Sequence, residues 1–225
     1  YMNISYVLII ISFAITIAAQ IFINCRYNKY LKIHNGIGLS GLEVAQKILK
    51  ANGLDDVYVV ETKGILSDHF DPSANVVRLS SAVYGGDSVS SAAIAAHEVG
   101  HAIQHKEGNF FMKLRKFIFP VVNISSKFGY IAIFVGLIFG LLDLFYIGVG
   151  MLVVILFFQL VTLPVEFDAS RKGLANLKKY NLIDSDGMRG ASRVLVAAAL
   201  TYVAGLATTL LEIFRLLLMV TGDRD

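Results

Sequence analysis

The chain has 225 residues, of which 56% are hydrophobic and 16% are charged, and its formal net charge is +3. Soluble globular domains are less apolar and carry about a quarter charged residues, so this composition predicts a membrane protein. The small net charge, without a dense basic stripe, argues against nucleic acid as a partner, and the single cysteine, Cys25, excludes an intramolecular disulfide.

The first predicted element is a transmembrane helix over residues 1–25, which carry no charge and are long enough to span a bilayer. Apolar residues return over 117–165, where Asp143 separates two long segments, and this pattern predicts a transmembrane hairpin that turns at Asp143. The last apolar segment, residues 194–225, predicts a transmembrane or membrane-associated helix. The sequence therefore predicts a mainly α membrane protein with about four such helices.

Basic residues gather next to these segments at three places. They follow the first segment, precede the hairpin and follow it again: Arg26, Lys29, Lys32, Lys113, Arg115, Lys116, Arg171, Lys172, Lys178 and Lys179. The positive-inside rule assigns such residues to the cytoplasm. It therefore predicts an N-terminus outside the cell, a cytoplasmic region over residues 26–116 and a cytoplasmic helix over residues 166–193.

Residues 26–116 have the pattern of a small α+β region. Apolar residues recur at helical spacing over 40–53, and Ser40 is placed to cap this helix. A short β-branched run at 57–62 and two extended pieces on either side of a turn at 71–73 predict strands.

A further predicted helix in this region, residues 88–105, contains a metal-binding pattern. His97, Glu98 and His101 form an H-E-x-x-H sequence. Residues i and i+4 lie one turn apart on one helical face, so both imidazoles can reach one zinc ion. Glu98 is rotated about 100° from His97, which favours contact with a water and a role as general base. His105 lies another turn along and is expected beside the site or on the surface, because three such histidines are too widely spaced for one ion.

The third ligand must come from another segment, and the candidates are Glu166 and Asp168, just after the hairpin. An ionisable group at such a boundary is costly unless it is paired or coordinated. Residues two positions apart on a helix differ by roughly 200° of rotation, so only one of these carboxylates can face the metal. The other is expected to support the site or to pair with Arg171, and spacing alone leaves the choice open.

Three stretches around these residues resemble the YugP-type membrane zinc peptidases of bacteria: "AAHEVGHAIQH", "LVTLPVEFDASRKGLANL" and "VLVAAALTYVAGLA". Matches at "GILSDHFDP" and "NVVRLSSAVY" extend the resemblance over essentially the whole chain. More distantly, the chain is similar to the HtpX and CAAX-prenyl-protease class of membrane zinc peptidases.

In that class, a glutamate within a Glu-x-x-x-Asp pattern completes the zinc site. The resemblance therefore implies one Zn²⁺ per chain with Glu166 as its third ligand. The aspartate of the pattern supports a histidine ligand, and Ser170 stands in its place here. Ser170 can form a hydrogen bond but carries no charge, and Asp168 is a candidate to fill the aspartate's role.

The same class binds peptide along an edge strand, and the resemblance implies residues 66–70 or 75–80 as that strand. His69 is a candidate for an electrophilic role at the tetrahedral intermediate, and a role in stabilising the turn is the alternative. Arg193 and Tyr202 are further candidates for stabilising the oxyanion.

The expected function is that of a membrane-anchored zinc endopeptidase of the bacterial plasma membrane, with a zincin-like site that faces the cytoplasm. Its expected partners are peptide or protein substrates, membrane proteins among them, and the lipid bilayer.

An intramembrane site-2-type protease is disfavoured because the predicted helix over 88–105 is too polar and short to span comfortably. A non-catalytic zinc-binding scaffold or adaptor is disfavoured because closed structural sites often use Cys, whereas this motif contains a potential base. A zinc transporter would be expected to carry histidine in its spanning segments, which have none.

Overall fold

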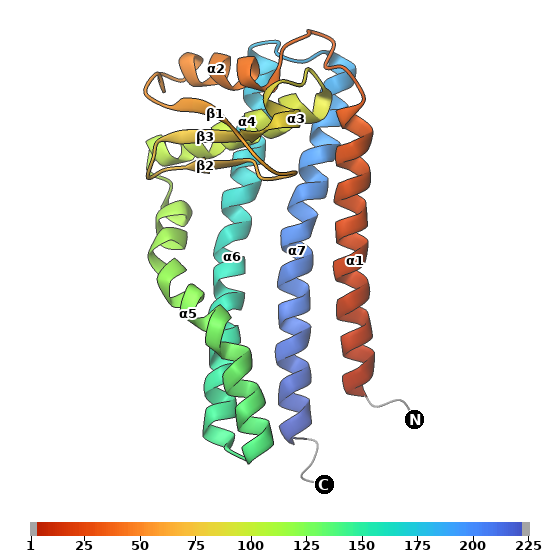
Figure 1. The fold of residues 1–225 in the computed structure, drawn as a ribbon, viewed down its shortest axis with the longest axis vertical. Helices are drawn as coiled ribbons and strands as arrows, with labels where there is room; N and C mark the ends of the chain where they lie inside the picture. Colours follow the sequence, from red (N-terminus) through yellow and green to blue (C-terminus); the bar gives the residue numbers. More distant parts are fainter. Residues whose placement is uncertain (1–3, 222–225) are drawn as a thin grey trace. The chain divides into compact units, whose positions relative to one another are not determined.

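The computed structural model describes residues 4–221 and shows a mostly helical chain with three short strands. The elements in chain order are α1 (Ile4–Leu31), α2 (Gly41–Ala51), β1 (Tyr58–Thr62), β2 (His69–Asp71), β3 (Val76–Ser80), α3 (Ser81–Tyr84), α4 (Val89–Glu107), α5 (Phe110–Phe139), α6 (Leu142–Lys179) and α7 (Ser185–Thr221) (Figure 1). Residues 1–3 and 222–225, the outer ends of the first and last predicted segments, lie outside the described residues.

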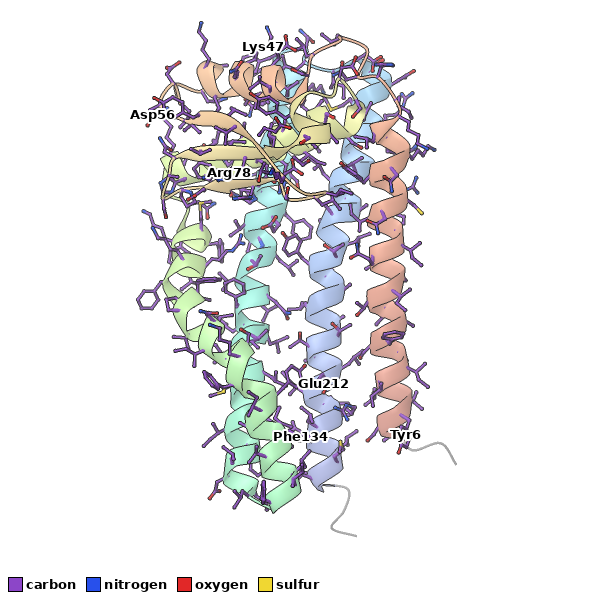
Figure 2. The ribbon with its side chains drawn as sticks, in the orientation of Figure 1. Tyr6, Lys47, Asp56, Arg78, Phe134 and Glu212 are labelled. Carbon is purple, nitrogen blue, oxygen red and sulfur yellow. The ribbon has the colours of Figure 1, made fainter. Side chains whose placement is uncertain are left out.

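Four of the described helices, α1, α5, α6 and α7, are long and apolar enough to cross a membrane. This finding confirms the expected mainly helical fold, with four helices that are candidates to span a membrane. Large apolar side chains along them are exposed, as Tyr6 and Phe134 illustrate in Figure 2. Exposed apolar side chains of this kind suit a lipid environment rather than water.

Two compact units share these helices. The first unit consists, in its described part, of residues 4–20, 113–164 and 200–221. The second unit consists of residues 21–112 and 165–199.

In the first unit, α5 and α6 form a tightly packed hairpin. A Cβ added at Gly136 would lie 2.6 Å from the backbone nitrogen of Phe145, and one added at Gly148 would lie 2.7 Å from the carbonyl oxygen of Gly129. The predicted hairpin is therefore present, but its turn lies at Gly140, whose φ of 66° is easy only for glycine. Asp143, expected at the turn, lies in the first turn of α6 instead, where its negative charge suits the helix dipole.

Two helix boundaries also differ from the predicted ones. Helix α5 begins at Phe110 rather than near residue 117, because the Asn109 side chain accepts a hydrogen bond from Met112 N and so caps the helix there. Residues 166–193 form the end of α6 and the start of α7 rather than one helix. The break follows from Asn181, which has a φ of 51°, and from Asp184, whose side chain accepts a hydrogen bond from Gly187 N.

The second unit contains the sheet, in the order β1-β3-β2 (Figure 1). Strand β3 lies in the centre, parallel to β1 and antiparallel to β2. Val77 and Leu79 of β3 are fully buried. Arg78 between them, labelled in Figure 2, forms an ion pair with Asp71 of β2 at 4.0 Å. The expectation that residues 75–80 form an edge strand is therefore wrong, since that segment pairs on both sides, and residues 66–70 contribute an edge strand through β2.

Helices α2 and α4 pack against this sheet and against each other. Helix α2 contacts β1, and α4 contacts both β2 and β3. Each helix begins as predicted: Ser40 forms a capping box with Glu43, and Ser88 accepts a hydrogen bond from Ser91 N. Most of α4 is buried, because alanine and serine on its surface let neighbouring elements approach closely. The H-E-x-x-H sequence thus lies within the core of the second unit.

Candidate metal centre

The site begins with an unusually close contact between α4 and the second unit's part of α6. A Cβ added at Gly100 would lie 3.0 Å from the carbonyl carbon of Ala169, and one added at Gly173 would lie 2.8 Å from the carbonyl oxygen of Ala96. Real Cβ atoms rarely approach other atoms so closely. Glycine at these two positions therefore lets the two helices meet backbone to backbone beside the histidines.

This contact brings three ligand-type side chains together. The Nε2 atom of His97 lies 3.3 Å from Glu166 Oε2, and the Nε2 atom of His101 lies 3.6 Å from the same oxygen. Glu166 is 3% exposed, and both imidazoles are largely buried. Within residues 4–221, these three residues form the group of His, Cys, Asp or Glu side chains that could hold a metal ion.

The other ring nitrogen of each histidine is engaged on the far side. His97 Nδ1 lies 3.1 Å from Ser170 Oγ, and His101 Nδ1 lies 3.0 Å from Gln104 Oε1. Both Nε2 atoms are therefore left to face Glu166. Partners of this kind orient histidine ligands in metal sites.

Gln104 is a residue of this site that was not predicted from the sequence. It is fully buried, and its Nε2 atom donates to the carbonyl oxygen of Val165 and to Asp168 Oδ2, at 2.8 and 2.9 Å. Its position could have predicted this role, because Gln104 is a polar residue three positions after His101, on the same face of an apolar helix.

Asp168 does not join the three ligand-type side chains. Its carboxylate accepts hydrogen bonds from Gln104 and from Arg171, one through each oxygen. This arrangement is one of the two that the sequence left open, in which Glu166 approaches the histidines and Asp168 supports the site and pairs with Arg171.

Glu98 lies on the buried side of α4 and is 8% exposed. Burial raises the pKa of its carboxyl group, and the charges of His97 and His101 oppose that shift. Burial also acts to lower the pKa of His101, but the hydrogen bond with Glu166 and the charge of Glu98 outweigh it, so that pKa is raised. Carboxyl and imidazole groups with shifted pKa values are common at functional sites.

The other candidate residues have contacts of their own. His69 is exposed on β2, and its Nδ1 atom lies 2.8 Å from the carbonyl oxygen of Ser67, a contact that suits the turn-stabilising alternative. Arg193 donates to the Tyr30 hydroxyl at 3.1 Å. Tyr202 belongs to the first unit and is 39% exposed. His105 is exposed, with its ring 5.8 Å from that of Phe70.

Asp68, next to His69, is held by Ser80. Its Oδ1 atom accepts from Ser80 N at 2.7 Å, and both of its oxygens lie 3.1 Å from Ser80 Oγ. Burial raises the pKa of this carboxyl group despite these hydrogen bonds, and its charge contributes to the raised pKa of Glu98. These hydrogen bonds thus attach the segment just before β2 to β3, which packs against α4, the helix that carries the H-E-x-x-H sequence.

The three converging side chains fit a zinc ion by chemistry and by spacing. Two imidazole nitrogens and one carboxylate oxygen form a donor set typical of zinc sites that keep a fourth position open. Tetrahedral ligands about 2.1 Å from an ion lie about 3.4 Å from one another. The separations of 3.3 and 3.6 Å between Glu166 and the two histidines match that spacing.

Comparisons with known proteins agree with this chemistry. The chain is 42% identical over 207 residues to the protein named "Putative membrane protease YugP" of Bacillus subtilis (strain 168), and the match covers 92% of each chain. No solved structure shows significant similarity. Residues 5–221 match the family described as "Putative neutral zinc metallopeptidase", and the chain therefore belongs to that family.

Proposed function

We propose that this protein is a membrane-anchored zinc endopeptidase in which His97, His101 and Glu166 bind one Zn²⁺. The observation that carries the proposal is the convergence of the two Nε2 atoms on one oxygen of Glu166, at separations that suit tetrahedral zinc. The name of the Bacillus subtilis relative, a membrane protease, supports it.

When bound, zinc supplies Lewis-acid polarisation of the scissile carbonyl and makes a water molecule easier to deprotonate. The chain's own residues do the rest. Glu98 follows His97 on α4 and is buried beside the cluster, where it takes a proton from the attacking water and later delivers it to the leaving amine.

The proposed substrate is an extended segment of a peptide or protein, membrane proteins included. An extended peptide binds an open strand edge through main-chain hydrogen bonds. Strand β2 lies at an edge of the sheet and contacts α4, so a peptide added to β2 runs beside the helix that carries Glu98. The other edge strand, β1, packs against α2 instead.

The proposed location is the bacterial plasma membrane, with the site on the cytoplasmic side. Helix α4 is not among the four described helices that are apolar enough to span a bilayer, which favours a site outside the hydrocarbon region. The basic residues at the end of α1, at the start of α5 and at the end of α6 favour the cytoplasmic side for the chain between α1 and α5 and for the chain after α6.

The test uses the full chain purified in detergent. The wild type should contain about one zinc per chain and hydrolyse an unfolded protein substrate, and a chelator should remove both zinc and activity. In Glu98→Gln, zinc content should stay at the wild-type level while hydrolysis falls by at least about 1,000-fold. Equal hydrolysis by Glu98→Gln and wild type would refute the role of Glu98, and a wild type that binds no zinc would refute the proposal as a whole.

A further inference from the structure

The hydrogen bonds of Gln104 determine which way its side-chain amide faces. Its Nε2 atom lies 2.8 Å from the carbonyl oxygen of Val165 and 2.9 Å from Asp168 Oδ2. A carbonyl oxygen can only accept a hydrogen bond, and the Asp168 carboxylate, which is ion-paired with Arg171, also accepts. The NH₂ group must therefore point to α6, because the opposite orientation would set oxygen against oxygen at both contacts.

The orientation of the amide then fixes the proton on His101. Gln104 Oε1 lies 3.0 Å from His101 Nδ1, and an amide oxygen only accepts. Nδ1 must carry a hydrogen in this contact. In the neutral ring, Nε2 is then the nitrogen with the free lone pair, and it is Nε2 that lies 3.6 Å from Glu166.

His97 has no comparable constraint. Its Nδ1 atom lies 3.1 Å from the Ser170 hydroxyl, and a hydroxyl can donate or accept a hydrogen bond. Either tautomer of His97 is compatible with that contact. The fixed tautomer therefore belongs to His101 and depends on a chain of partners that runs from Arg171 through Asp168 and Gln104.

We infer that Gln104, supported by Asp168, is a positioning residue that keeps His101 in the Nδ1–H tautomer with Nε2 free to bind the metal; this inference rests on the proposed zinc site. Gln104 is 0% exposed and meets three partners, so its geometry is held from both helices. Ser170 carries no negative charge beside the histidines. The negative charge of Asp168 acts on His101 indirectly, through the Gln104 amide, which forms hydrogen bonds with both residues.

The test compares four variants of the full chain: Gln104→Leu, Gln104→Glu, Asp168→Asn and the double variant Gln104→Glu/Asp168→Asn. Gln104→Leu removes the acceptor of His101 Nδ1 and should weaken zinc binding about 10- to 100-fold. Gln104→Glu keeps that acceptor but places a second carboxylate against Asp168 and against the Val165 carbonyl, so it should also bind zinc more weakly. In the double variant, the new amide donates to the new carboxylate and still accepts from Arg171. Only the contact with the Val165 carbonyl then stays unfavourable, so zinc affinity should recover part of the way from Gln104→Glu toward wild type.

Two measurements separate positioning from a purely structural role. Zinc affinity is measured by competition with a chelator, and the visible absorption spectrum is recorded after loading with Co²⁺, whose bands report the ligand geometry. Gln104→Leu should shift these bands, and the bands of the double variant should lie closer to wild type than those of Gln104→Glu. Gln46→Glu, an exposed change on α2, is the control for the added charge and should leave affinity and spectrum unchanged.

Each outcome bears on a different claim. A wild type that binds neither Zn²⁺ nor Co²⁺ overturns the proposed function and this inference together. A wild type that binds metal, with unchanged affinity and spectrum in Gln104→Leu, overturns this inference alone. Failure of the double variant to recover over Gln104→Glu overturns the part assigned to Asp168.

Discussion

Gly100 of α4 packs against the backbone of Ala169 of α6 so closely that a Cβ at residue 100 would lie 3.0 Å from the Ala169 carbonyl carbon. Gly100 is the residue just before His101, and Ala169 is the residue just before Ser170. The close approach of the two helices thus sets the separation between the histidines on α4 and Glu166 on α6.

Gly100→Ala should therefore push the two helices apart. Overpacking of this kind costs about 1–3 kcal/mol of stability, and the accompanying shift should weaken zinc binding. Thermal unfolding and chelator competition measure the two effects. Gly150→Ala is the control, because a Cβ at Gly150 meets no atom within 4 Å and alanine favours the helix. Equal zinc affinity in Gly100→Ala and Gly150→Ala would show that this contact does not position the ligands.

Glu166 and Asp168 are predicted to differ in their effect on metal binding. Glu166→Gln removes a proposed ligand and should lower zinc affinity by more than about 100-fold, whereas Asp168→Asn removes a supporting charge and should cost about 10-fold. Titration of the apo-protein with zinc measures both. A larger loss in Asp168→Asn than in Glu166→Gln would reverse the assignment of the third ligand.

Zinc affinity should depend on pH through His101. The pKa of His101 is raised above its ordinary 6.5, so in the metal-free protein the protonated ring contributes stability that is fully present below pH 6.5 and is lost as pH rises through the raised pKa. Zinc binds only the deprotonated ring, so its affinity should increase with pH above about 6.5 and binding should release protons. Calorimetry in buffers of different ionisation enthalpy measures this release. An affinity independent of pH between about 6 and 8 would contradict the assignment of His101 as a ligand.

In the first unit, Glu212 and Arg215 form an ion pair on α7 (Figure 2 labels Glu212), with both side chains at most 20% exposed. Arg215→Leu leaves the carboxylate without its partner and should destabilise the chain by about 3–5 kcal/mol. The double variant Glu212→Leu/Arg215→Leu removes both charges and should be more stable than Arg215→Leu. A denaturant titration in mixed micelles measures the stability of each variant. A double variant less stable than Arg215→Leu would contradict the expectation that the unpaired Glu212 carboxylate causes the loss of stability.

The proposed orientation can be tested with single cysteines in a Cys25→Ser background. Lys47 is exposed on α2, and Leu141 is 51% exposed in the α5–α6 turn. A membrane-impermeant maleimide added to intact spheroplasts should label Leu141→Cys but not Lys47→Cys, and it should label Lys47→Cys once the membrane is opened. Labelling of Lys47→Cys in intact spheroplasts would place the site outside.

Much of this structure follows from local sequence patterns. The apolar segments predicted α1, α5, α6 and α7 because length and composition alone decide whether a helix can span a bilayer. Ser40 marked the start of α2 because capping involves residues only a turn away. The spacing of His97 and His101 placed both side chains on one face for the same reason.

Other features depend on contacts between distant segments, and the sequence could not supply them. The central place of β3 follows from strand order, which a strand's own composition does not reveal. The role of Gln104 appears only once α6 brings Val165 and Asp168 to its amide. The turn at Gly140 was missed because the only charged residue nearby, Asp143, gave the stronger signal.

The most direct test of the central claim is to locate the metal and its ligands in the zinc-loaded protein by anomalous scattering at the zinc absorption edge. One ion should lie among His97 Nε2, His101 Nε2 and a carboxylate oxygen of Glu166, at about 2.0–2.2 Å from each. An ion held by Asp168, or by residues outside this cluster, would contradict the assignment of His97, His101 and Glu166 as the zinc ligands.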